Sequence, residues 1–253
     1  MIDIPMRSSQ SLDSNTILRI NHSAKYQTAQ NINNWKPIQN NVTPTPPNRT
    51  PIQTPVEQPA VSIPVLAVPP LLKKIQKGQK VPLSSSGSVR HIKVCLGWNV
   101  KNPRCDLDVS AFILGANGKV LGDDWFVFYG QESSPDQSVH FSLSTQTDRE
   151  YISVDFSRLN PTAQKIVFVL TINDAFVHNL NFSMVKDAYI RILNADTQQE
   201  LVSFQMTDYY PNVISMMIGE IYLYQGIWKC SAVGNGVAKD LAGLCELYGV
   251  QVM

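Results

Sequence analysis

Residues 165–172 read Lys-Ile-Val-Phe-Val-Leu-Thr-Ile, a run rich in β-branched side chains with no alternation between polar and apolar positions. Such a run is typical of a strand that is covered on both faces. The polar pair Asn173-Asp174 follows it directly and marks the end of the strand. We therefore expect residues 165–172 to form the central strand of a sheet.

Short runs of β-branched and aromatic residues lie on both sides of this strand, and turn residues separate them. The pattern is typical of an all-β fold, here an antiparallel β-sandwich, because a parallel α/β fold would alternate strands with helices. Asn117-Gly118 and Gln225-Gly226 are the sharpest hairpin signals, since Gly and Asn tolerate positive φ. The other expected strands are His91–Trp98, Asp106–Leu114, Trp125–Tyr129, Tyr151–Phe156, Ala188–Leu193, Leu201–Met206, Val213–Tyr224 and Ile227–Ala232.

One short helix is expected at the C-terminal end of the chain. Apolar side chains fall on one face at helical spacing, at Val237, Leu241, Leu244 and Tyr248. Gly249 stands where a left-handed C-terminal cap is expected. We expect this helix to pack across an open side of the sheets.

The first 70 residues differ in composition from the remainder. They hold 11 of the 16 prolines and are rich in Asn, Gln and Thr. Such a segment buries too little apolar surface to offset the entropy of ordering. We therefore divide the chain into a disordered tail, residues 1–70, and one folded domain, residues 71–253.

Charge and cysteine usage narrow the class of protein. The net charge is +1, from 21 basic and 20 acidic residues, which disfavours a nucleic-acid binder because such a protein needs a basic face. The sequence shows no signal peptide and no apolar stretch long enough to span a membrane. The four cysteines have no CxxC spacing, so we expect reduced thiols and a cytoplasmic location.

Acidic residues gather where the expected strands end. Asp106 and Asp108 are two apart, so in a strand their carboxylates point the same way, about 7 Å apart. A hard cation that takes oxygen ligands, typically Ca2+, relieves the repulsion between such groups. The structural alternative is a solvated strand end.

Further ligands for such an ion must come from other loops. Asn173 and Asp174 are the best candidates, and Asp148 and Glu150 are next. A two-residue turn at Asn117-Gly118 would set Asp108 opposite Val127 and Asp123 opposite Phe112, because hairpin register follows from turn length. Asp123 and Asp124 would then lie near the turn and outside this site.

Catalysis has little support in the sequence. The four histidines stand in no triad or metal-binding spacing. No GxSxG, P-loop or GxGxxG motif is present. We therefore expect no catalytic residues and no enzymatic activity.

Several runs, in this order, resemble the TerD-type domain of tellurium-resistance and stress-response proteins. They are Val94-Cys95-Leu96-Gly97-Trp98, Asp106-Leu107-Asp108-Val109-Ser110-Ala111-Phe112, Phe126-Val127-Phe128-Tyr129, Lys165–Ala175, Ala188-Tyr189-Ile190-Arg191, Gly219-Glu220-Ile221-Tyr222 and Trp228-Lys229. The ending, with Val233-Gly234-Asn235-Gly236, Leu241–Cys245 and Tyr248-Gly249-Val250, looks closest to the TerA branch. The resemblance runs from about Leu71 to the C-terminus.

The resemblance implies a β-sandwich that binds Ca2+ through acidic loops and contributes to resistance to tellurite and other stresses, with no established enzymatic activity. Its ligand candidates are Asp106, Asp108 and Asp174, with Asp148 and Glu150 at the place of the family's Asp-Asp-Glu. Other Ter-family stress proteins are the implied partners.

The sequence also departs from the family pattern. Residues 142–147 form a short, uncharged loop where calcium-binding members have a long Gly-Asp-rich one, and Arg149 replaces the middle acid. Arg104 stands where an acidic residue is usual, and either arginine could neutralise the aspartates. Two hypotheses follow: a non-enzymatic calcium-responsive stress protein, or a metal-independent scaffold that binds other Ter proteins.

Overall fold

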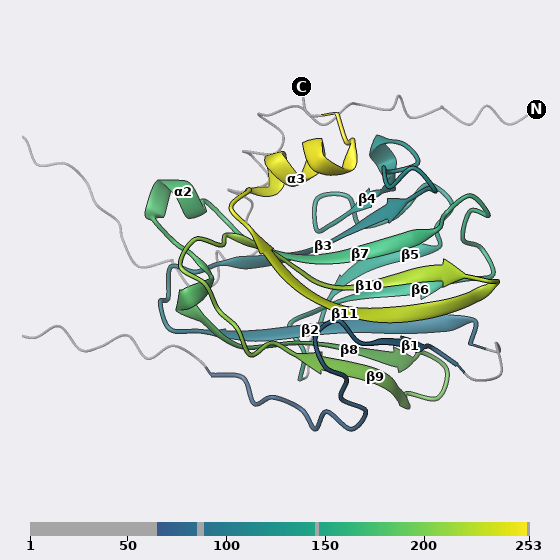
Figure 1. The fold of residues 1–253 in the computed structure, drawn as a ribbon, viewed down its shortest axis with the longest axis horizontal. Coiled ribbons are helices and arrows are strands. Elements are labelled where there is room, and N and C mark those ends of the chain that lie inside the picture. Colours follow the sequence, from purple (N-terminus) through teal and green to yellow (C-terminus); the bar gives the residue numbers. More distant parts are fainter. Residues whose placement is uncertain (1–64, 85–88, 145–146, 252–253) are drawn as a thin grey trace, which may run out of the picture. The chain divides into compact units, whose positions relative to one another are not determined.

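Two antiparallel sheets form the framework of the protein (Figure 1). The computed structural model describes residues 65–84, 89–144 and 147–251, so most of the expected tail lies outside the described residues. The six-stranded sheet has the order β1-β11-β10-β7-β3-β4, and the five-stranded sheet has the order β5-β6-β2-β8-β9. The all-β prediction is therefore confirmed.

The elements follow the predicted runs closely, with a few additions. The strands of the six-stranded sheet are β1 (Lys80–Pro82), β3 (Leu107–Leu114), β4 (Phe126–Val127), β7 (Lys165–Ile172), β10 (Ser215–Tyr224) and β11 (Ile227–Val237). Those of the five-stranded sheet are β2 (His91–Val100), β5 (Val139–Leu143), β6 (Glu150–Asp155), β8 (Val185–Asn194) and β9 (Glu200–Gln205). The helical segments are η2 (Asp123–Trp125), α2 (Ala175–His178), η3 (Phe182–Met184) and α3 (Leu241–Tyr248).

Strand β7 is central, as its apolar sequence predicts. It lies between β10 and β3, and seven of its eight residues are buried. Phe168 and Leu170 face the core between the two sheets. Val167 and Val169 point to the opposite side, where they pack in a second apolar cluster with α3. Polar and apolar residues do not alternate in this run because each face of β7 packs in its own apolar cluster.

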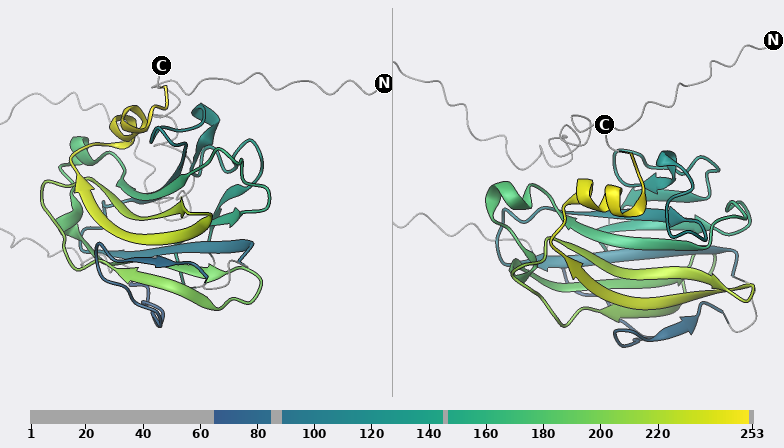
Figure 2. Two further views of the ribbon diagram at one scale, coloured as in Figure 1. Left: turned by 45° about the vertical axis from the view of Figure 1, so that its right-hand side comes forward. Right: turned by 45° about the horizontal axis from the view of Figure 1, so that its top comes forward.

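Helix α3 covers the outer side of the six-stranded sheet, as both views of Figure 2 show. Leu244 is fully buried there, and the Tyr248 ring lies 4.5 Å from that of Phe112. The Asp240 carboxylate caps the first turn by accepting a hydrogen bond from Gly243 N at 2.9 Å. Gly249 ends the helix with φ of 82°, the left-handed cap that the sequence predicts.

The hairpin after β3 corrects the predicted register. Val127 pairs with Ala111, and not with Asp108 as a two-residue turn would require. The turn is longer than two residues, because Gly118 N bonds to Gly115 O. In addition, residues 123–125 form η2 before β4 starts. Asp123 therefore lies outside the strand, where its carboxylate accepts from Gln251 N at 2.8 Å. At the other hairpin, Gln225 and Gly226 both have positive φ, as expected for a tight turn.

The segment before β1 contacts both sheets. Ile75 N bonds to Ser203 O of β9, and Gly78 N bonds to Ala232 O of β11. Further upstream, the buried Asn99 side chain donates to Leu66 O at 2.9 Å and accepts from Leu66 N at 2.8 Å. The ordered contacts thus begin before residue 71, where the sequence placed the start of the domain.

Candidate ligand and metal site

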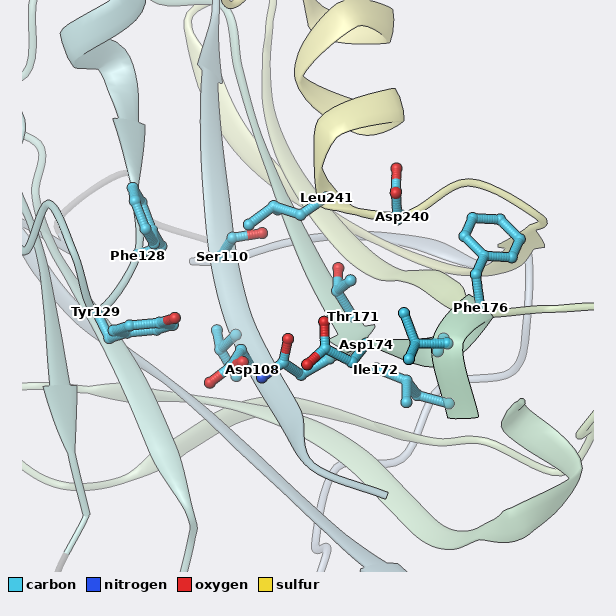
Figure 3. A pocket seen from close by; sticks show the side chains of 14 residues that line it. Asp108, Ser110, Phe128, Tyr129, Thr171, Ile172, Asp174, Phe176, Asp240 and Leu241 are labelled. Carbon is cyan, nitrogen blue, oxygen red and sulfur yellow. The ribbon is translucent and has the colours of Figure 1, made fainter. Parts of the chain in front are cut away.

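A cavity of about 160 Å³ opens at one end of the six-stranded sheet, next to α2 (Figure 3). Its lining comes from the start of β3, the end of β7 with α2, the start of α3, and the chain after β4. The lining residues are Asp108, Val109, Ser110, Phe128, Tyr129, Thr171, Ile172, Asn173, Asp174, Ala175, Phe176, Val177, Asp240 and Leu241. Three carboxylates and one amide side chain therefore share a cavity with aromatic and aliphatic groups.

The pairing of β3 with β7 brings two of the predicted acidic loops together. Leu107 pairs with Ile172 and Asp108 with Thr171, and Asn173 N bonds to Asp106 O at 2.8 Å. Leu107 and Val109 point into the core, so Asp108 and Ser110 point to the outer side of the sheet. Asp108, Asn173 and Asp174, three of the predicted ligands, consequently line the same cavity.

Asp106 lies beside this group but outside the cavity lining. It precedes β3, which begins at Leu107, so it is not held in the strand with Asp108. The alternation that would direct Asp106 and Asp108 to one point applies only within a strand. The structure therefore gives Asp108 and Asp174, and not Asp106 and Asp108, as the two cavity carboxylates among the predicted ligands.

Asp174 and α2 have an unusual backbone. Asp174 has φ of 46° and Asn179 has φ of 52°, so left-handed residues flank both ends of this four-residue helix. Few residue types other than Gly adopt this conformation, and Asp and Asn are among those that do so most readily. The geometry turns the Asp174 side chain into the cavity (Figure 3) and leaves Phe176 and Val177 exposed at its rim.

Asp148 lies on the opposite outer face of the sandwich. Arg191 of β8 places Nη2 2.7 Å from its Oδ2, and the Tyr189 hydroxyl donates to Oδ1 at 2.9 Å. Tyr189 fits there because residue 97 is glycine: a Cβ at Gly97 would lie 2.3 Å from the Tyr189 hydroxyl oxygen. Arg149 does not neutralise Asp148; its Nε donates to Trp98 O at 2.6 Å.

Glu150 lies between the two sheets and is only 1% exposed. Its Oε2 accepts a hydrogen bond from Val109 N at 2.9 Å. Strand β4 pairs only with Ala111 and Phe112 of β3. The Glu150 carboxylate therefore accepts the hydrogen bond from Val109 N that a longer neighbouring strand would otherwise accept. Neither Asp148 nor Glu150 lines the cavity that holds Asp108 and Asp174.

The donor chemistry of the cavity suits a hard cation, because carboxylate, hydroxyl and amide oxygens line it and none of its described lining residues is Lys, Arg or His. The six predicted ligands do not converge on one point, however. Within residues 65–84, 89–144 and 147–251, no three His, Cys, Asp or Glu side chains are grouped closely enough to hold a metal ion. A calcium site here would rest on Asp108, Asn173 and Asp174.

The four cysteines are buried and form no disulfides. Burial raises the pKa of Cys95 to about 12, and the nearby Asp148 carboxylate acts in the same direction. Burial also raises the pKa of Cys105. These thiols are therefore poor nucleophiles at neutral pH.

Ser110 and Asp240 are polar cavity residues that sequence reasoning did not identify. Ser110 follows Asp108 by two positions, so strand alternation places both on one face and could have identified it. Asp240 is the N-cap of α3, a role that its position before Leu241 predicts, but its place in the cavity depends on how α3 packs on the sheet.

Comparison with known proteins identifies relatives of the chain. The TerD domain model matches residues 72–248. The tellurium resistance protein TerD from Serratia marcescens is 37% identical over 185 residues, which cover 70% of this chain and 96% of that protein. General stress protein 16U from Bacillus subtilis is 35% identical over 188 residues, covering 70% of this chain and 97% of that protein.

Two further comparisons concern the TerA branch and solved structures. TerA from Alcaligenes sp is 32% identical over 126 residues, 50% of this chain and 35% of that protein. A structure described as a homologue of the telluride resistance protein TerD, from Streptomyces coelicolor A3(2), has a TM-score of 0.48 and 16% identity. It covers 66% of this chain and 100% of that one.

Proposed function

The chain belongs to the TerD domain family, and we propose that it serves in resistance to tellurite and other chemical stress as a non-enzymatic protein that binds Ca2+. The names of the relatives, tellurium resistance protein and general stress protein, support the stress role. The observation that carries the binding role is the joint placement of Asp108, Asn173 and Asp174 in a cavity whose described lining residues include no basic side chain.

Calcium would be held at the edge of this cavity by side-chain oxygens of Asp108, Asn173 and Asp174. Sites in proteins usually supply six to eight oxygen ligands, including backbone carbonyls and water. With two side-chain carboxylates, the affinity belongs at the weak end of protein sites, about 10⁻⁵ to 10⁻³ M. Asp148 and Glu150 are excluded from this proposed set, because each is already engaged on another part of the sandwich.

A cytoplasmic location fits the four unpaired, buried thiols, because cysteines remain reduced in that compartment. Independently of location, no helix in the described ranges is both long enough and apolar enough to cross a bilayer. Neither observation bears on calcium.

A second candidate function is a metal-independent scaffold that binds other Ter-family proteins. It is favoured by the engagement of Asp148 with Arg191, which removes one carboxylate from the expected calcium ligands. The exposed Phe176 and Val177, 62% and 74% accessible, give α2 an apolar surface available for contact. This function predicts no response of the protein to calcium.

Thermal melting in millimolar CaCl2 and in EGTA separates the two functions. Binding to the folded form alone raises the melting temperature as calcium increases. Asp174→Asn should reduce this shift, and Asn tolerates the left-handed backbone at that position. Asp208→Asn, at an exposed carboxylate outside the cavity, is the matched control and should respond like the parent.

A parent protein whose melting temperature is the same in CaCl2 and EGTA would rule out the calcium proposal and favour the scaffold. In that case, purified protein should form a complex with a second purified TerD-domain protein in size-exclusion chromatography, in EGTA as in calcium. The role in resistance itself is tested by survival on tellurite of cells that lack the gene, with and without a plasmid copy.

A further inference from the structure

The cavity has apolar lining residues that a metal ion would not require. Three carboxylates, those of Asp108, Asp174 and Asp240, belong to the lining. The lining also has apolar side chains, among them Phe128 and Leu241, and Figure 3 shows these two across the cavity from Asp108 and Asp174, with Asp240 next to Leu241. A calcium ion gains nothing from an apolar wall, because all its ligands are oxygens. The combination instead suits a molecule with a positive charge and a hydrocarbon part.

Ser110 gives an independent indication of a ligand. Its side chain is 2% exposed, and its hydroxyl has no hydrogen-bond partner among the described residues. Figure 3 shows the hydroxyl pointing from β3 into the space enclosed by the lining side chains. A buried hydroxyl without a partner costs about 1–3 kcal/mol, and such groups are uncommon in folded proteins. A ligand N–H that reached the Ser110 oxygen would remove this cost.

The size of the cavity limits the ligand. Its volume of about 160 Å³ is close to that of an engineered apolar cavity of about 150 Å³ that holds a benzene molecule. The exposed Phe176 at the rim shows that the cavity opens to solvent on the α2 side, so a slightly longer molecule can extend outward. The ligand thus has roughly six to eight non-hydrogen atoms.

The charge of the lining selects the sign of the ligand. Among the described residues, three carboxylates and no basic side chain line the cavity. An anion would be repelled, whereas a cation next to a carboxylate in a partly buried site is stabilised more than in water. Aromatic faces, here Phe128 and Tyr129, also attract ammonium groups.

We propose that this cavity binds a small organic ammonium ion. The ammonium group lies at Asp108 and Asp174 and donates one hydrogen bond to Ser110 Oγ, and the hydrocarbon part packs against Phe128 and Leu241. This goes beyond calcium binding and does not depend on it. The two cations share Asp108 and Asp174, so each should weaken the binding of the other.

Isothermal titration calorimetry of the full chain in EGTA tests the proposal with three probes of one shape. Benzylamine carries the positive charge, benzyl alcohol is neutral, and benzoate is negative. Benzylamine should bind at least about tenfold more tightly than benzyl alcohol, since about 1.4 kcal/mol of charge interaction gives that factor. Benzoate should show no binding.

Two serine variants supply a matched pair. Ser110→Ala should weaken benzylamine about tenfold, because a hydrogen bond to a charged group contributes about 1.5 kcal/mol or more. The same variant should melt at an equal or higher temperature without ligand, since it removes a buried hydroxyl that lacks a partner. Ser203→Ala is the control: Ser203 is 1% exposed and its hydroxyl also has no partner among the described residues, but it lies in β9 outside the cavity. It should bind benzylamine like the parent.

The outcomes separate this inference from the calcium proposal. Equal affinity for benzylamine and benzyl alcohol, or unchanged benzylamine affinity in Ser110→Ala, would overturn the ammonium site. Absence of benzylamine binding would overturn it too, while a calcium-induced melting shift would still support calcium binding. If the protein binds benzylamine but its melting temperature does not change with calcium, the ammonium site is supported and only the calcium proposal is rejected. Ser110→Ala should leave any calcium response intact, because Ser110 is not in the proposed calcium ligand set.

Discussion

Arg191 and Asp148 form a buried ion pair on the outer face of the five-stranded sheet, with Nη2 2.7 Å from Oδ2. The side chains are 16% and 6% exposed, respectively. Because the pair is largely shielded from water, removing either charge would leave the other without compensation. This pairing gives Asp148 a structural role in the chain.

Arg191→Ala should destabilise the protein by about 3–5 kcal/mol, because it leaves the buried Asp148 carboxylate with the Tyr189 hydroxyl but without its cationic partner. Urea unfolding followed by tryptophan fluorescence measures the loss. Lys165→Ala is the matched control, since it breaks a more exposed pair with Glu220. That change should cost less than about 1 kcal/mol. Similar losses in both variants would contradict a special role for the buried pair.

Leu244→Ala should cost about 2–5 kcal/mol, because Leu244 is fully buried between α3 and the six-stranded sheet. Leu247→Ala on the same helix is the control, because Leu247 is 41% exposed. Its unfolding free energy should stay within about 0.5 kcal/mol of the parent value. A Leu244→Ala variant as stable as the parent in urea would show that α3 does not contribute to the folded core.

Acid should weaken the fold partly through Asp136. Burial alone would raise its pKa, but hydrogen bonds from Ser138, Ser134 and Asn160 outweigh this effect and leave the pKa below its ordinary value. A carboxyl whose pKa is lowered by folding stabilises the protein above the unfolded pKa of about 3.9, and this contribution is lost as pH falls through the folded pKa.

Asp136→Asn removes that contribution. The variant should be less stable than the parent at pH 7, and the two unfolding free energies should converge as the pH falls below about 4. Urea unfolding at several pH values measures both curves. A difference that stays constant down to pH 2 would show that Asp136 is not the group responsible.

The N-terminal boundary can be tested by truncation. A chain that starts at Val65 should melt like the full chain, because the Pro-rich composition of residues 1–64 predicts no contribution to the core. A chain that starts at Leu71 loses both hydrogen bonds between Leu66 and the buried Asn99. It should be less stable by about 1–3 kcal/mol. Equal melting of the two truncated chains would place the boundary at residue 71, as the sequence did.

The sequence predicts elements whose signal is local. The apolar run of β7 and the spacing of Leu241, Leu244 and Tyr248 identify a central strand and the C-terminal helix, because burial determines which residue types occupy those positions. Strand β5 was missed; in its sequence, Val-His-Phe-Ser-Leu, only two of five side chains are fully buried. The register after β3 was wrong because η2 occupies part of the expected strand.

The candidate site shows the same limit. Strand ends that are paired in the sheet, such as Asp108 and Asn173, can be predicted to meet because β3 and β7 share a register. The pairing of Asp148 with Arg191 could not be predicted, since the two residues are 43 positions apart and come together only when β6 and β8 flank β2. The long-range ion pair between Asp148 and Arg191 therefore explains why Asp148 is not among the cavity carboxylates.

The most direct test of the cation site is a calcium titration of ¹⁵N-labelled protein followed by NMR. We expect the backbone amides that shift most to belong to Asp108, Asn173, Asp174 and the residues of α2, with a midpoint of about 10⁻⁵ to 10⁻³ M. The amides of Asp148 and Glu150 should shift far less, because those carboxylates are engaged with Arg191 and with Val109 N. Shifts centred on residues 147–150, or no shifts at millimolar calcium, would contradict a calcium site at Asp108, Asn173 and Asp174.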